Sequence, residues 1–309
     1  MTDRRSGKAI FRELGKLVTE QRNPRSKNLD RLSTAQILKL MNQEDRRVPL
    51  AVGREIKHIT RAVDMIVERL QRGGRLFYVG AGTSGRLGVL DATECPPTFG
   101  TPRTLVQGII AGGRKALVRS VEGSEDDSKT SQAALRKHRV GKNDVVVGIM
   151  ASRRTPYALG ALEYGRRVGA ATIAVTANPS RSAPLRCDVV IAPRVGPEVL
   201  TGSTRLKAGT AQKIALNLFS TLAMVRLGRV YRGLMVDVRA SNEKLRRRSV
   251  QMVARIAGCA EDAAAAALGA GGGDVRLAAL IARGLERSAA EASLKKHDGD
   301  LRAALAELG

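Results

Sequence analysis

The chain has 309 residues, of which 43% are hydrophobic, and it carries a formal net charge of +24 at pH 7. This length predicts one large or two smaller domains with a full hydrophobic core. The chain contains no apolar run long enough to predict a membrane-spanning helix, and its N-terminus lacks the apolar stretch of a secretion signal. Three widely spaced cysteines fit neither a disulfide framework nor a zinc ribbon, so we expect a cytoplasmic protein with no membrane partner.

The positive charge raises the question of a nucleic-acid partner. The basic residues are spread over the whole chain, and only four Phe, four Tyr and no Trp are available to stack on bases. The densest basic cluster, at residues 246–248, is equally typical of a solvated helix face. We therefore expect small anions, rather than nucleic acid, to be attracted by this charge.

The first 71 residues are predicted to be helical. Residues 1–47 are polar and form a helical arm in pieces, with a break at Asn23-Pro24. Ser33 followed three residues later by Gln36 predicts a capping box at the start of an apolar helix. Residues 48–71 then carry apolar side chains at helical spacing, which predicts one longer helix.

The middle of the chain alternates between apolar runs and helical stretches. Five β-branched runs occupy residues 75–80, 104–111, 144–151, 172–177 and 188–193. Helical stretches at 126–138 and 156–168 and a long helix at 204–227 accompany them. Near-continuous apolar strands separated by helices predict an α/β fold, a three-layer sandwich around a five-stranded parallel sheet.

The last part of the chain is Ala-rich and predicts a small all-α domain, with a helix near residues 242–257. We therefore predict three segments. They are a helical arm at 1–47, an α/β domain at 48–230 and a C-terminal helical domain at 231–309.

The loop at residues 80–86 (GAGTSGR) directly follows the first predicted strand. Gly82 and Gly85 let the backbone approach a ligand, and Thr83 and Ser84 add hydroxyl donors at a helix start, which favours a phosphate. The same glycines fit a dinucleotide fingerprint, but that motif needs an acidic residue about twenty positions later, and the second strand ends in Gly-Gly-Arg instead. A purely structural glycine turn remains a further alternative.

Two more loops predict ligand contacts. Ser152, Arg154 and Thr155 follow the third strand and precede Pro156, so they belong at a second strand-to-helix junction, although an ordinary N-cap explains them equally. The third loop opens the long helix. Its candidates are Glu198 for sugar hydroxyls and Ser203, Arg205 and Lys207 for anionic oxygens, with a solvated loop and cap as the alternative.

Carboxylates are the candidates for chemistry. Glu94 precedes a Pro-Pro turn, and Glu125 lies at the start of a helix. Two carboxylates brought to one pocket divide the acid and base roles of a reaction, but acids in a first helical turn are also ordinary partners of the helix dipole. The three His residues have no metal-ligand spacing, so we expect no metal site.

Six motifs resemble the N-acetylmuramic acid 6-phosphate etherases. They lie at residues 19–24, 80–86, 91–100, 121–126, 201–213 and 234–238. The resemblance runs from residue 19 to about residue 258 and is looser in the tail. It implies a sugar isomerase-type α/β domain, a small C-terminal helical domain and a homodimer.

The resemblance also implies a reaction. The family cleaves the lactyl ether at C3 of N-acetylmuramic acid 6-phosphate, giving N-acetylglucosamine 6-phosphate and D-lactate in murein recycling. Matching motifs assign Glu125 as the base that removes the C2 proton and Glu94 as the acid that protonates the departing lactate oxygen. No cofactor is implied, because the substrate's own carbonyl holds the developing charge. A non-catalytic sugar-phosphate sensor resembling the glucokinase regulatory protein is the alternative.

One position departs from the family pattern. The second loop usually reads Ala-Ser-Gly-Arg-Thr-Pro, and here Arg153 replaces the glycine. If that position needs a positive φ, Arg153 strains the loop. If the backbone is tolerant, Arg153 adds a cation near the phosphate.

Overall fold

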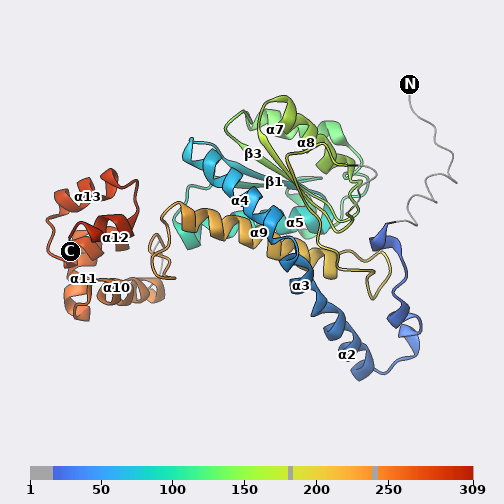
Figure 1. Cartoon of the computed structure of the whole chain (residues 1–309), viewed down its shortest axis with the longest axis horizontal. Helices are drawn as coiled ribbons and strands as arrows, with labels where there is room; N and C mark the ends of the chain where they lie inside the picture. Colours follow the sequence, from blue (N-terminus) through green and yellow to red (C-terminus); the bar gives the residue numbers. More distant parts are fainter. Residues whose placement is uncertain (1–16, 180–183, 239–242, 309) are drawn as a thin grey trace. The chain divides into compact units, whose positions relative to one another are not determined.

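A five-stranded parallel sheet forms the centre of the fold in the computed structural model, which describes residues 17–179, 184–238 and 243–308 (Figure 1). The strands are β1 (Leu76–Gly80), β2 (Val106–Ile110), β3 (Val145–Ile149), β4 (Ala171–Val175) and β5 (Val189–Ile191). Their order in the sheet is β2-β1-β3-β4-β5. Every residue of the three central strands is buried, as expected when helices cover both faces, so the predicted α/β sheet is confirmed.

Helices lie on both faces of this sheet. On one face, α7 (Ser128–Lys137) and α8 (Pro156–Arg167) cover Phe77 and Val79 of β1. On the other face lie α4 (Ile56–Gln71) and α5 (Gly82–Phe99) (Figure 1). The approach of α5 is close, because a Cβ placed on Gly88 would lie 2.9 Å from the Cβ of Tyr78. The predicted three-layer sandwich is therefore confirmed.

The N-terminal part consists of short helical turns followed by two helices. The turns are η1 (Val18–Glu20), η2 (Pro24–Ser26) and η3 (Leu29–Arg31), and the helices are α2 (Thr34–Asp45) and α3 (Arg47–Gly53). The predicted capping box is confirmed, since Ser33 and Gln36 hydrogen-bond each other's backbone N–H groups. The single helix predicted over 48–71 is wrong. The helix is interrupted between α3 and α4. Here the carboxylate of Glu55 accepts a hydrogen bond from the N–H of Ala192, which follows β5.

The helix α5 also differs from the prediction. A turn was expected at Pro96-Pro97, but the helix includes both prolines and ends at Phe99. The turn comes at Gly100, whose φ of +62° favours glycine. A Cβ at Gly100 would lie 2.3 Å from the carbonyl oxygen of Asp237, so the close approach of that backbone also requires glycine here.

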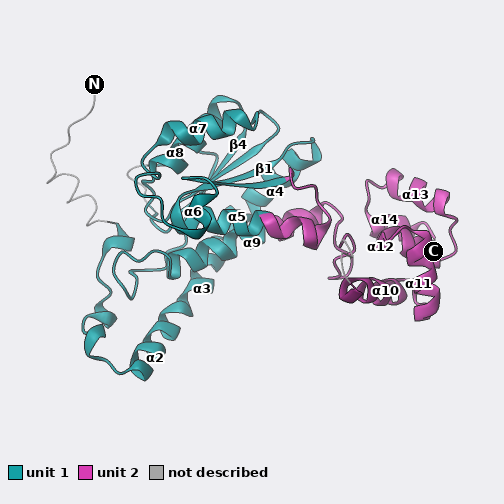
Figure 2. Ribbon diagram, turned by 180° about the vertical axis from the view of Figure 1, so that it is seen from behind, with its two compact units in different colours: residues 1–92, 106–219 teal, residues 93–105, 220–309 magenta. Residues whose placement is uncertain are grey.

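The chain divides into two compact units (Figure 2). Unit 1 comprises residues 1–92 and 106–219, and unit 2 comprises residues 93–105 and 220–309. The long helix α9 (Lys207–Arg226) begins in unit 1 and ends in unit 2. The domain boundaries that we predicted, at 47/48 and 230/231, stay predictions.

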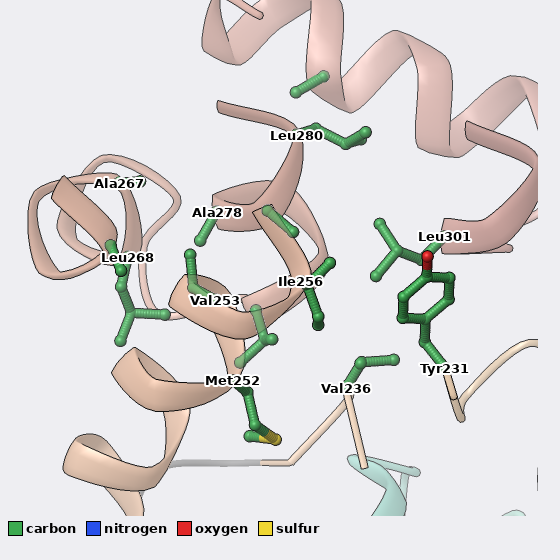
Figure 3. Close-up of a cluster of buried hydrophobic side chains, with 14 of the residues drawn as sticks. Tyr231, Val236, Met252, Val253, Ile256, Ala267, Leu268, Ala278, Leu280 and Leu301 are labelled. Atoms are coloured by element: carbon green, nitrogen blue, oxygen red, sulfur yellow. The ribbon is translucent and has the colours of Figure 1, made fainter. Parts of the chain in front are cut away.

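Unit 2 contains a separate hydrophobic core built by five helices (Figure 3). They are α10 (Glu243–Ala257), α11 (Glu261–Ala270), α12 (Val275–Ala282), α13 (Arg287–Lys296) and α14 (Leu301–Ala306). Tyr231 and Val236, from the segment before α10, complete this cluster, and Tyr231 lies beside Leu301 (Figure 3). The small all-α C-terminal part is thus as expected. Within the described residues, we find no helix whose length and hydrophobicity would let it cross a membrane.

A buried ion pair connects the N-terminal arm of unit 1 to α9. Glu44 of α2 and Lys207 at the start of α9 are both almost fully buried, and Nζ of Lys207 lies 2.5 Å from Oε2 of Glu44. Asn23 donates to the same oxygen at 2.9 Å, and Arg25 donates to Oε1 at 2.9 Å. Burial alone raises the pKa of Glu44, but Lys207, Asn23 and Arg25 together lower it to about 2. Glu44 is therefore ionised at neutral pH and is fully partnered.

We predict that Glu44→Gln destabilises the protein by about 3 kcal/mol at pH 7, because it leaves the Lys207 ammonium buried without a counter-charge. The pKa of Glu44 is about 2 in the folded chain and about 4.3 when unfolded, so the contribution is complete above the higher value and is lost as the pH falls toward the lower one. Urea unfolding at pH 7 and at pH 3 measures this, and the gap between wild type and variant should narrow at pH 3. Equal stability at pH 7 would contradict the prediction.

Candidate functional site

The candidate site lies at the edge of the sheet where β1 and β3 end. These two parallel strands are neighbours, and β1 also pairs with β2 on its other side. After β1 the chain therefore adds β2 on one side and then β3 on the other, so the strand order switches direction between β1 and β3. Ligands of open α/β sheets bind at such a reversal, beyond the carboxyl ends of the strands. The loops after β1 and β3 are the first and second loops identified from sequence, and both belong to unit 1.

The first loop has the backbone of an anion site. The helix α5 begins at Gly82, which is exposed and has a φ of +52°. The N–H groups in the first turn of a helix have no partner within it, and they carry the positive end of the dipole. Gly85 is required for packing, because a Cβ there would lie 2.6 Å from both the carbonyl oxygen of Gly80 and Cγ1 of Ile110.

Thr83 and Ser84 also contact the start of α9. The Ser84 hydroxyl is buried and donates to Oε1 of Gln212 at 3.0 Å. Cγ2 of Thr83 lies 3.4 Å from the position that a Cβ on Gly209 would take. The structure therefore brings the first loop against the helix that the third loop opens. Gln212 was missed in the sequence, because one Gln inside a long helix gives no signal of its own.

The second loop offers hydroxyl groups that do not cap the helix after it. Thr155 occupies the N-cap position of α8 but makes no side-chain cap hydrogen bond, and Pro156 starts the helix as predicted. Ser152 accepts the N–H of Arg154 at 3.3 Å, which closes a local turn. The alternative that Thr155 merely caps the helix is therefore not supported. The ligand roles of Ser152, Arg154 and Thr155 stay predictions.

Glu125 lies next to the second loop. Its backbone carbonyl accepts the N–H of Tyr157, the second residue of α8, at 3.0 Å, and its side chain is exposed. The cap of α7 is Asp127, whose side chain accepts the N–H groups of Lys129 and Thr130. Asp127, rather than Glu125, is therefore the ordinary acidic partner of this helix start, which leaves the carboxylate of Glu125 for another role.

Glu198 and Lys207 serve the protein itself in this structure. The side chain of Glu198 is buried, and its two oxygens accept the N–H groups of Lys207 at 3.1 Å and Ala208 at 2.9 Å. Burial raises the pKa of Glu198, and those two hydrogen bonds and the Lys207 charge oppose the rise. The ammonium of Lys207 is held by Glu44 and by the Pro197 carbonyl. The binding roles predicted for both residues remain untested.

The other predicted residues are placed as follows. Ser203 is half-buried and Arg205 is exposed, both in the turn before α9. Glu94 is exposed on the part of α5 that belongs to unit 2, and its pairing with Glu125 stays a prediction. Among residues 17–179, 184–238 and 243–308, no three His, Cys, Asp or Glu side chains are grouped to hold a metal ion.

Arg153 has a positive φ, which was one of the two alternatives that the sequence left open at this position. Its φ is +69°, in the left-handed region that favours glycine, and its side chain is 9% exposed. Burial lowers the pKa of its guanidinium, and the neighbouring Cys187 opposes that shift. The positive φ supports backbone strain at this position, and the burial of the side chain argues against a cation presented to the ligand.

We predict that Arg153→Gly is more stable than Arg153→Ala by about 1 kcal/mol. Both variants remove the guanidinium, but only glycine also removes the Cβ that makes the left-handed conformation costly. Urea unfolding of the two variants measures the difference. An alanine variant as stable as the glycine variant would show that the loop stores no strain.

Comparison with known families matches the α/β part of the chain. The model of the glucokinase regulatory protein N-terminal SIS domain matches residues 58–166, and that of the SIS domain matches residues 126–222. A phosphoheptose isomerase from Francisella tularensis has a similar fold, with a TM-score of 0.50 at 15% identity, covering 63% of this chain and all of that one. At this identity the likeness concerns the fold alone.

Relatives that match most of the chain share one name. An N-acetylmuramic acid 6-phosphate etherase of Symbiobacterium thermophilum is 58% identical over 87% of this chain and 90% of its own length. One of Mesorhizobium japonicum is 51% identical over 96% of this chain and 97% of its own. One of Actinobacillus pleuropneumoniae is 48% identical over 97% of this chain and 99% of its own. The chain therefore belongs to the N-acetylmuramic acid 6-phosphate etherase family.

Proposed function

We propose that this protein is an N-acetylmuramic acid 6-phosphate etherase, which cleaves the D-lactyl ether at C3 and yields N-acetylglucosamine 6-phosphate and D-lactate. The observation that carries the proposal is the position of Glu125. The backbone of Glu125 is hydrogen-bonded to the start of α8, directly after the second of two phosphate-type loops, and Glu125 is exposed, in a chain whose named relatives match it over almost its full length. Binding and chemistry are thus supported at the same edge of the sheet.

The first and second loops would hold the 6-phosphate. The start of α5 supplies backbone N–H groups, and Thr83 adds a hydroxyl at the same point. Ser152 and Thr155 supply hydroxyls from the neighbouring strand end, with Arg154 as an exposed cation. The net charge of +24 favours the approach of an anionic substrate.

Glu125 would act as the base and Glu94 as the acid. Glu125 removes the C2 proton of the open-chain sugar, whose aldehyde at C1 makes that proton acidic. The bond between C3 and the ether oxygen then breaks, and Glu94 donates a proton to that oxygen, which leaves as part of lactate. A double bond remains between C2 and C3. Water then adds at C3 and a proton returns to C2, so the two products account for the substrate plus one water.

The remaining assignments belong to the same proposal. We place the enzyme in the cytoplasm, where its sugar-phosphate substrate would occur, and we propose that it is a homodimer. Leu38, Leu50 and Ile56 are large apolar side chains that are each more than 60% exposed on α2, α3 and α4, which supports a second copy as their cover. Light scattering after gel filtration measures the mass, and a monomer at working concentration would remove the dimer from the proposal.

We predict that the purified protein releases D-lactate from N-acetylmuramic acid 6-phosphate. The second candidate is a non-catalytic sugar-phosphate sensor, favoured by the match of residues 58–166 to the glucokinase regulatory protein domain. Lactate is measured enzymatically, and sugar-phosphate binding is measured by calorimetry. Tight binding without lactate would favour the sensor over the enzyme.

We further predict that Glu125→Gln abolishes exchange of the C2 proton with solvent deuterium, because an amide cannot accept that proton. Glu94→Gln should retain some exchange, since proton removal precedes the departure of lactate. Glu122→Gln, an exposed carboxylate on the same loop, is the control. Deuterium at C2 is followed by NMR, and exchange at the normal rate in Glu125→Gln would mean that the base is another group.

A further inference from the structure

The N-terminal segment of residues 17–31 is fixed to the end of β3 by one buried amide. Nδ2 of Asn178 donates to Oγ1 of Thr19 at 3.0 Å and to the carbonyl oxygen of Ala151 at 2.8 Å. Oδ1 of Asn178 accepts the N–H of Thr19 at 3.4 Å. Thr19 and Asn178 are both almost fully buried. Because Ala151 directly precedes Ser152, Asn178 places Thr19 beside the second loop.

A second contact fixes the same segment to the third loop. Nδ2 of Asn23 donates to the carbonyl oxygen of Pro197 at 3.0 Å and to Oε2 of Glu44 at 2.9 Å. Residues 19–23 therefore run from the second loop to the third loop, along the edge of the sheet where the candidate site lies. Residues 19–23 thus border this edge of the sheet, and we refer to them below as the wall.

Glu20 lies on this wall between the two attachment points. One of its oxygens, Oε1, accepts the hydroxyl of Thr19 at 3.2 Å. The other, Oε2, lies 3.7 Å from the position that a Cβ on Gly202 would take. The side chain is exposed, and among the described residues no Lys or Arg forms an ion pair with it. Its carboxylate can therefore accept hydrogen bonds from a ligand without first giving up an ionic partner.

The third loop lacks another carboxylate for this purpose. Both oxygens of Glu198, the acid predicted there from sequence, accept backbone N–H groups of α9 inside the protein. We propose that Glu20 is the carboxylate that binds hydroxyl groups of the sugar whose phosphate the first and second loops are proposed to hold. This inference rests on the proposed function, since it names a further binding residue of the same site.

The chemistry of a carboxylate explains what Glu20 adds. Its two oxygens only accept hydrogen bonds, and they bind hydroxyl donors strongly. Such a group selects sugar phosphates over inorganic phosphate, which has no carbon-bound hydroxyls to offer. A carboxylate that only stabilised the fold would not discriminate between these two anions.

The test compares Glu20→Gln and Glu20→Ala with Asp30→Asn, an exposed acid of the same N-terminal segment. Loss of a charged hydrogen bond should raise the KM for N-acetylmuramic acid 6-phosphate on the order of 10- to 100-fold while kcat changes little. The Kd for N-acetylglucosamine 6-phosphate, measured by calorimetry, should rise similarly. The inhibition constant of inorganic phosphate should stay unchanged, and Asp30→Asn should resemble wild type.

Several outcomes would overturn the inference. Glu20 variants that bind N-acetylglucosamine 6-phosphate as tightly as wild type would remove Glu20 from the site. Weaker binding of inorganic phosphate by the same factor would show a general structural effect, as would a lowered unfolding temperature that Glu20→Asp does not restore. If wild type releases no lactate, the proposed function fails, but the calorimetric comparison still decides whether Glu20 binds the sugar.

Discussion

The buried pair of Glu44 and Lys207 is the interaction on which the candidate site most depends. It joins α2 to the first residue of α9, and Asn23 adds the N-terminal segment to the same oxygen. Either charge alone would be costly at this depth, so the three elements hold one another in a single arrangement. The third loop, which lies between β5 and α9, is therefore positioned by buried contacts within the protein.

The fold could be predicted from sequence because its signals are redundant. Three strands are apolar at nearly every position, and only burial between two layers of helices accommodates such runs. Local rules failed where tertiary contacts decide. The prolines at 96 and 97 predict a turn by themselves, yet the helix continues to Phe99. The turn comes at Gly100, where the nearby backbone of Asp237 leaves no space for a Cβ.

The candidate site was predictable in its loops but not in the use of each side chain. Gly82, Gly85 and Thr83 follow from the spacing of a strand, a glycine turn and a helix start. Composition cannot tell whether a carboxylate contacts the ligand or the protein. In the structure, Glu198 is buried and accepts backbone N–H groups at the start of α9, whereas Glu20 is exposed. At Arg153, the family motif shows that an arginine replaces a glycine, but it does not show whether the backbone is strained there. Only the structure, in which φ of Arg153 is positive, supports strain.

The attachment of the N-terminal segment has a consequence for biosynthesis. Thr19 pairs with Asn178, and Asn23 pairs with Pro197, so the partners are 159 and 174 residues apart. A ribosome delivers Thr19 and Asn23 long before it delivers their partners, and closing so long a loop costs entropy that only the finished sheet can offset. This wall therefore forms only after all five strands of the sheet have been synthesised, and binding competence arrives after the α/β core is complete.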